Sequence, residues 1–214
     1  MAVAPAAVGT AASIRGWLLW RLHRRRNAAP GAPAPSFDLQ GSDGHRHALE
    51  DFTEPALVLV FMSNRCPGVK AYDGRLRRLQ QRFAGRLRIV GINPVDEHLY
   101  PDESLAGMRI ALQERGLDLV YLKDRHQATM HDYGALCTPH VFLLDAQRRI
   151  RYEGRIDDAL VERNVRKRYL EDAVAAVLGG RRPKVTRTMP LGCSIDATAS
   201  SVLAVGEAER GLAA

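Results

Sequence analysis

Residues 56–70 read Ala56-Leu-Val-Leu-Val-Phe-Met-Ser-Asn-Arg-Cys-Pro-Gly-Val-Lys70, and this stretch decides the fold. Its first seven residues are all apolar and partly β-branched, which is typical of a central strand that is buried on both faces. A short polar loop ends that strand. Pro67 then suits the first position of a helix, because the N–H that proline lacks would have no partner there. The stretch therefore predicts a strand–loop–helix unit with Cys66 at the junction.

The flanking sequence continues this alternation of strands and helices. Hydrophobic periodicity and turn residues predict a hairpin over 37–49, helices over 67–83, 102–115, 125–133 and 165–178, strands over 87–92 and 117–122, and a strand pair over 141–152. Such an order favours an α/β domain in which a central mixed β-sheet is flanked by helices on both faces.

The composition divides the chain into three parts. Residues 1–35 contain no acidic residue and end in a Pro/Ala-rich stretch, so we expect a basic, flexible leader. The folded domain is expected over 36–180, followed by a tail, 181–214, that carries Cys193. The arginine-rich segment 13–26 leaves three interpretations open: a flexible leader, a weak contact with a membrane surface, and a targeting signal. The expected location is the cytoplasm, or a membrane or the exterior if the leader is such a signal.

The net charge of +7 raises the question of nucleic-acid binding. Only four of the 31 basic residues are lysines, and many arginines alternate with acidic residues on predicted helix faces, as in 163–172. That pattern is typical of a solvated helix surface. Neither a zinc-finger spacing nor an aromatic RNA-binding signature is present. We therefore predict no specific nucleic-acid partner.

The chain has three cysteines, Cys66, Cys137 and Cys193, too few for a disulfide-stapled scaffold. An odd number directs attention to thiol reactivity. Cys66 occupies the predicted N-cap of a helix, where free N–H groups and the helix dipole favour the thiolate. The neighbouring Arg65 and Lys70 are expected to lower its pKa further. These features predict that Cys66 is the reactive thiol, whereas the alternative is a buried and inert cysteine.

A second informative patch precedes the apolar strand at 141–144. A proline at the entrance to a strand is tolerated only at the strand start or in a special turn, which makes a cis Thr138–Pro139 bond a candidate. After the strand pair, Arg155, Asp157 and Asp158 are expected to anchor a loop by salt bridges rather than to take part in catalysis.

Four stretches carry a resemblance to a known family: Phe61-Met-Ser-Asn-Arg-Cys-Pro-Gly-Val-Lys70, Tyr133-Gly-Ala-Leu-Cys-Thr-Pro139, Tyr152-Glu-Gly-Arg-Ile-Asp-Asp158 and Leu191-Gly-Cys-Ser-Ile195. Together they resemble the peroxiredoxin-like branch of the redoxin/thioredoxin superfamily, with an AhpC/TSA-type domain and a single Cys-Pro active site. The resemblance covers residues of about 35–195 and implies a thioredoxin-like fold. It further implies that Cys66 is the nucleophile and that Thr138 and Pro139 form the cis-proline loop beside it.

The chain also departs from the family pattern. The second cysteine of the thioredoxin motif would fall at Val69, so the usual Cys-x-x-Cys dithiol is absent. The peroxiredoxin signature has proline seven residues and threonine or serine three residues before its cysteine; Ser63 fits and Leu59 does not. A resolving thiol must therefore come from elsewhere. Cys193, on a tail long enough to fold back, and Cys137 are the candidates, and for Cys137 a structural role is favoured.

These observations predict a thiol-dependent oxidoreductase without a cofactor. The predicted catalytic residues are Cys66, Cys193, Thr138 and Pro139, and the supporting ones are Arg65, Pro67, Lys70, Cys137, Arg155 and Asp157. The Cys66 thiolate would attack a protein disulfide or a peroxide, and Cys193 or an external thiol would resolve the product.

Two alternatives stay open at this stage. One is a redox-inert thioredoxin-fold module that binds a partner protein through the same groove. The other is a carrier of copper or another soft metal that uses Cys66, with Cys137 and His140 as further ligands, although no ligand-spacing motif supports it.

Overall fold

The computed structural model describes residues 28–196; the segment 13–26 discussed above lies outside the described residues. The strands are β1 (Asp38–Gly41), β2 (Arg46–Ala48), β3 (Ala56–Phe61), β4 (Leu87–Asn93), β5 (Val120–Lys123), β6 (Cys137–Thr138), β7 (His140–Asp145), β8 (Ile150–Gly154) and β9 (Cys193–Ser194). The α-helices are α2 (Pro67–Lys70), α3 (Asp73–Arg82), α4 (Leu105–Arg115), α5 (Ala128–Tyr133) and α6 (Tyr169–Leu178). None of the helices in this part of the chain has the length and apolar character needed to cross a membrane.

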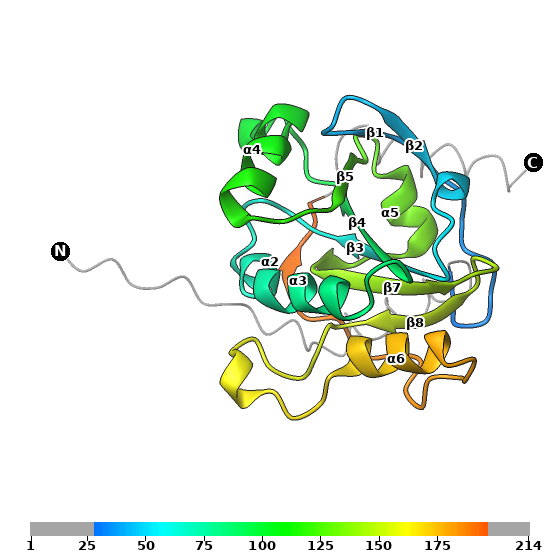
Figure 1. Cartoon of the computed structure of the whole chain (residues 1–214). Coiled ribbons are helices and arrows are strands. Elements are labelled where there is room, and N and C mark those ends of the chain that lie inside the picture. The colour runs from blue at the N-terminus through cyan, green and yellow to red at the C-terminus, as the bar shows by residue number, and fades with distance from the viewer. Residues whose placement is uncertain (1–27, 197–214) are drawn as a thin grey trace, which may run out of the picture.

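Seven strands form one mixed sheet in the order β2-β1-β5-β4-β3-β7-β8 (Figure 1). The three central strands β3, β4 and β5 run parallel, and β1, β7 and β8 pair antiparallel with their neighbours. A separate two-stranded sheet pairs β6 with β9. The predicted hairpin over 37–49 and the predicted strand pair over 141–152 are both confirmed.

Strand β3 is the centre of the core, as its apolar sequence predicts. All six of its residues are buried. Because side chains alternate between the faces of a strand, Val58 and Val60 pack with Leu76 of α3 and Leu170 of α6. The next cluster lies on the other face, where Leu57, Leu59 and Phe61 pack with Met130 and Tyr133 of α5. Figure 1 shows α4 and α5 on opposite sides of the sheet, so the α/β prediction of helices on both faces is confirmed.

The helix predicted over 67–83 is two helices, α2 and α3, with a break at Ala71 and Tyr72. The Arg75 guanidinium donates a hydrogen bond to the Ala71 carbonyl, and the Tyr72 N–H bonds to Val69 in a tight turn. Periodicity alone does not reveal this break, because the buried positions on either side keep helical spacing.

Three other predicted helices begin later than expected, in each case because a side chain binds the backbone. Ser104 caps α4, where its hydroxyl accepts from the N–H of Gly107. Asp124 accepts from the N–H groups of the first turn of α5. Asp158 accepts from the N–H groups of residues 166 and 167, which keeps the start of the predicted last helix extended. The C-terminal glycines Gly116 and Gly134 do adopt the expected left-handed conformation.

Both ends of the described chain are held against the domain. Within the Pro/Ala-rich stretch, the N–H of Gly31 bonds to the carbonyl of Ile150, and that of Ala34 to Arg148. At the other end, the backbone of Thr186 and Thr188 bonds to Glu153 of β8. The tail therefore runs along the edge of the main sheet towards β6.

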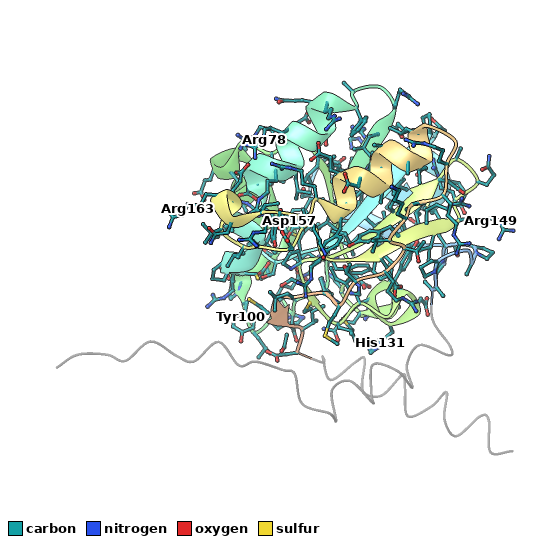
Figure 2. The ribbon with its side chains drawn as sticks, turned by 90° about the horizontal axis from the view of Figure 1, so that it is seen from below. Arg78, Tyr100, His131, Arg149, Asp157 and Arg163 are labelled. Carbon is teal, nitrogen blue, oxygen red and sulfur yellow. The ribbon has the colours of Figure 1, made fainter. Side chains whose placement is uncertain are left out.

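A buried ion pair fixes the loop after β8. Asp157 and Arg75 lie 2.5 Å apart, and both side chains are almost fully buried. Figure 2 shows Asp157 among the side chains in the interior of the domain. The predicted anchoring role is thus confirmed for Asp157. It is wrong for Arg155, whose guanidinium bonds instead to the carbonyl oxygen of Met189 in the tail.

Asp157→Asn is expected to lower the free energy of unfolding by about 3 kcal/mol, because it leaves the buried Arg75 charge without its counter-ion. The matched control is Glu162→Gln. This change breaks the half-exposed ion pair between Glu162 and Arg78, which lies on α3 as Arg75 does. That change is expected to cost less than about 1 kcal/mol. Urea unfolding followed by circular dichroism measures both. Equal effects of the two substitutions would contradict the structural role of Asp157.

Candidate active site

Cys66 lies in the loop that follows β3, beside the residues that precede the neighbouring strand β7. Phe61, the last residue of β3, pairs with His140, the first residue of β7, and this register brings the residues before β7 to the loop after β3. Cys66 is the N-cap of α2 with Pro67 at its first turn, as predicted. The Thr138–Pro139 bond is cis. The sheet therefore places the Cys-Pro and Thr-Pro patches side by side.

Cys66 Sγ contacts two groups from distant parts of the chain. It lies 2.8 Å from Sγ of Cys193, 127 residues away in the sequence, and both cysteines are free thiols. It also lies 3.0 Å from the carbonyl oxygen of Thr138, which accepts a hydrogen bond from the thiol form. Cys66 is only 2% exposed, whereas Cys193 is exposed. Of the two candidate resolving thiols, the structure brings Cys193 against Cys66.

Strand pairing carries Cys193 to this place. In the β6–β9 ladder, Thr138 is opposite Cys193 and Cys137 is opposite Ser194. The preceding residue is Gly192, where an added Cβ would lie 2.0 Å from the Thr138 carbonyl oxygen. Only glycine permits this close approach of the two backbones. In Figure 1 the orange tail segment passes beside α2 accordingly.

The pKa of the Cys66 thiol is lowered from its ordinary value, as predicted, and hydrogen bonds are the main cause. Burial raises the pKa, and hydrogen bonds from the side chains of Cys193 and Thr138 and from the backbone N–H of Val69 more than offset this effect. Arg65 and Lys70 are not among these groups. The Arg65 guanidinium turns away, to Asp102 and the ring of Tyr100. Hydrogen bonds, rather than the two predicted cations, are therefore the main groups that lower the pKa of Cys66.

The other two thiols behave in the opposite way. Burial, together with the hydrogen bond and negative charge of Cys66, raises the pKa of Cys193 to about 11. Burial raises the pKa of Cys137 to about 12, and its Sγ lies 3.8 Å from the carbonyl oxygen of Pro139. At neutral pH Cys66 is therefore the thiol most readily deprotonated, and Cys193 remains a thiol that donates to it. The structural role favoured for Cys137 agrees with its burial.

Glu103 holds the loop before Cys66, and the sequence analysis missed it. Its fully buried carboxylate accepts hydrogen bonds from Ser63 Oγ (2.5 Å), the N–H of Asn64 (3.0 Å), the N–H of Arg65 (3.1 Å) and Asn93 Nδ2 (2.7 Å). Such charge-assisted bonds are roughly twice as strong as neutral ones. Glu103 comes from a different segment, 38–40 residues further along the chain, so no local pattern points to it.

The groups around Cys66 do not form a metal site. His140 is fully buried, its Nδ1 accepts from the N–H of Leu136, and burial lowers its pKa to about 3. Residues 28–196 contain no group of three or more His, Cys, Asp or Glu side chains that could hold a metal ion. Cys66, Cys137 and His140, the soft ligands that the sequence offers, thus do not form such a group.

The arrangement defines a class of protein: an α/β protein with a thioredoxin-like fold that presents a cysteine with a lowered pKa at the helix start after its buried strand β3. The AhpC/TSA family matches residues 30–153, more than half of the 214 residues. The chain belongs to this AhpC/TSA family, as its motifs led us to expect.

Known proteins share the fold. A hypothetical protein, SMc02350 from Sinorhizobium meliloti 1021, has a TM-score of 0.75 and 36% identity, over 81% of this chain and 97% of that one. Peroxidoxin BcpB from Mycobacterium tuberculosis has a TM-score of 0.53 and 19% identity, over 72% and 98%. Thioredoxin-like protein YneN of Bacillus subtilis (strain 168) is 23% identical over 132 residues, 61% of this chain and 75% of YneN. These similarities confirm the thioredoxin-like fold.

Cys193→Ala is expected to raise the pKa of Cys66 by about one to two units, because a hydrogen bond to a charged group is worth about 1.5–3 kcal/mol. Cys193→Ser is the matched control, since its hydroxyl still donates and the pKa should shift much less. The pH dependence of iodoacetamide alkylation, with Cys66 quantified by mass spectrometry, measures this value. An unchanged pKa in Cys193→Ala would show that the contact does not stabilise the thiolate.

Proposed function

We propose that this protein is a thiol-dependent oxidoreductase in which Cys66 attacks the oxidant and Cys193 resolves the product as a Cys66–Cys193 disulfide. The observation that carries the proposal is the 2.8 Å contact between the two free sulfurs. A disulfide needs the sulfurs at about 2.05 Å, so a small movement of the tail suffices to form the bond. Val69 occupies the position of the usual second thiol, and Cys193 supplies it from the tail instead.

Either a peroxide or a disulfide can oxidise Cys66 and Cys193 to a disulfide. With a peroxide, the Cys66 thiolate attacks one oxygen, the O–O bond breaks, and an alcohol or water leaves behind a sulfenic acid. The Cys193 thiol then attacks this sulfur and releases water. With a disulfide, the thiolate forms a mixed disulfide and expels one thiol, and Cys193 displaces the second. In both cases a dithiol is oxidised to a disulfide, and two external thiols later reduce it again.

Family membership and the related proteins support a redox role. One similar structure is a peroxidoxin and the curated relative is a thioredoxin-like protein. The lowered pKa of Cys66 and its partner thiol fit this chemistry better than a redox-inert binding module. A soft-metal carrier is not favoured, because His140 and Cys137 make contacts with the backbone around the Thr-Pro patch.

Oxidation of the reduced protein by one equivalent of hydrogen peroxide or hydroxyethyl disulfide is expected to remove two thiols and to join Cys66 to Cys193. Thiol titration and non-reducing peptide mapping by mass spectrometry measure this outcome. Cys66→Ser should abolish turnover, because no other thiol has a lowered pKa. Cys193→Ser should stop the peroxide reaction at a sulfenic acid on Cys66, which dimedone traps.

Cys137→Ser serves as the matched control in the same assay. Its thiol is buried and its pKa is raised, so the Cys66–Cys193 disulfide should form at nearly the rate of the unaltered protein. If neither oxidant produces that disulfide, or if Cys137→Ser blocks it, the proposed pairing is wrong.

A further inference from the structure

Cys66 and Cys193 differ in both thiol acidity and solvent exposure. Cys66 has the lowered pKa but is 2% exposed, whereas Cys193 is exposed but has a raised pKa. The segment that covers Cys66 is the tail strand β9, which itself contains Cys193. A substrate that must reach the Cys66 sulfur therefore meets β9 first.

We propose that β9 restricts Cys66 to small oxidants, such as hydrogen peroxide and low-molecular-weight disulfides, and makes Cys193 the sulfur that an external reductant attacks. This inference rests on the function proposed above and adds the class of substrate and the point at which electrons enter.

Strand pairing is the first reason to expect exclusion of protein disulfides. An extended polypeptide that binds beside a strand uses the backbone groups of a free strand edge. Beside Cys66 this edge is β6, and the ladder from Thr138 to Cys193 and from Cys137 to Ser194 already occupies it. A protein disulfide would have to displace β9 before its own sulfur could approach Cys66 Sγ.

The tail is anchored on both sides of β9, which is the second reason. Before β9, Arg155 Nε donates to the carbonyl oxygen of Met189, and Thr188 Oγ1 bonds with the hydroxyl of Tyr152. After β9, Gln127 Nε2 donates to the carbonyl oxygen of Asp196 at 2.7 Å. A segment that is tied at both ends can move by the small amount that a peroxide needs more easily than it can leave the groove.

Close backbone contact is the third reason. Gly192 lies so near Thr138 that a Cβ would overlap its carbonyl oxygen. A Cβ at Gly68, on the other side of Cys66, would meet Cys66 Sγ at 3.5 Å and Pro139 Cδ at 3.6 Å. The backbone segments at Gly192 and at Gly68 therefore leave little space around the Cys66 sulfur.

The reduction step follows from the same geometry. In the oxidised state, a thiolate attacks whichever sulfur it can reach, and Cys193 is the exposed one. The new bond joins the reductant sulfur to Cys193 Sγ, the Cys66–Cys193 bond breaks, and Cys66 leaves as a thiolate. Because its pKa is lowered and that of Cys193 is raised, Cys66 is the better leaving group. A second reductant thiol then releases Cys193 and forms the oxidised reductant.

The test of substrate class compares hydroxyethyl disulfide with insulin, a protein disulfide, on the full-length reduced protein. Loss of the Cys66 thiol is followed by rapid acid quenching and mass spectrometry. We expect hydroxyethyl disulfide to react at least about tenfold faster than insulin, the ratio that roughly 1.4 kcal/mol of extra barrier would produce. Gly192→Ala should push β9 away from Thr138 and raise the ratio of the insulin rate to the hydroxyethyl disulfide rate by about tenfold, because any loss of the hydrogen bond from Cys193 lowers both rates alike.

Leu191→Ala is the matched control, because this exposed side chain lies on the same tail, next to Gly192. It should leave the ratio of the two rates unchanged. Arg155→Ala, which frees the tail before β9, is the second variant and should act in the same direction as Gly192→Ala. Circular dichroism verifies that each variant is folded.

The outcomes separate the two proposals. If Cys66 reacts with both disulfides at equal rates, or if neither tail variant raises the ratio of the insulin rate to the hydroxyethyl disulfide rate, β9 does not select the substrate, although the thiol-dependent function stands. If Cys66 reacts with neither disulfide and not with hydrogen peroxide, the proposed function fails and the inference fails with it.

The point of electron entry is tested on the oxidised protein. One equivalent of glutathione is added, the reaction is quenched with acid after a short time, and the mixed disulfide is located by mass spectrometry. We expect glutathione on Cys193. Glutathione found mainly on Cys66 would overturn this part of the inference.

Discussion

The pairing of β3 with β7 is the constraint on which the site depends. Strand β3 is buried on both faces, so its position in the sheet is fixed by packing as well as by hydrogen bonds. Its last residue, Phe61, pairs with His140, the residue after Pro139. This single register brings the loop that carries Cys66 to the loop that carries Thr138. The thiol, the carbonyl group that accepts from it and the edge strand β6 all follow from that meeting point.

Hydrogen-bond donors, rather than neighbouring positive charges, are the main groups that stabilise the Cys66 thiolate. Burial by itself would make the sulfur a poor nucleophile, because a thiolate is unfavourable in an apolar setting. Donors from Cys193, Thr138 and the first turn of α2 more than offset that effect. Since two of these donors come from other segments, the reactivity of Cys66 depends on the tail and on the Thr-Pro patch being in place.

The loop between β3 and α2 is organised by a buried carboxylate rather than by its own sequence. Glu103 accepts hydrogen bonds from three consecutive residues, Ser63 to Arg65, and so fixes the backbone that leads into Cys66. Ser63 is committed to this carboxylate, although its position matches a residue of the peroxiredoxin signature. The same motif position thus serves loop geometry here.

The sequence by itself determined the buried strand, the α/β class, the cysteine at the helix start and the cis-proline loop, because these depend on local periodicity, proline chemistry and motif spacing. Tertiary structure alone decided which thiol meets Cys66. Pairing between β6 and β9 and the absence of a side chain at Gly192 select Cys193, and both are contacts between segments more than 50 residues apart. It also decided that Arg65 turns away and that Glu103 supports the site. Such interactions leave no periodic signal, since they join single residues across the fold.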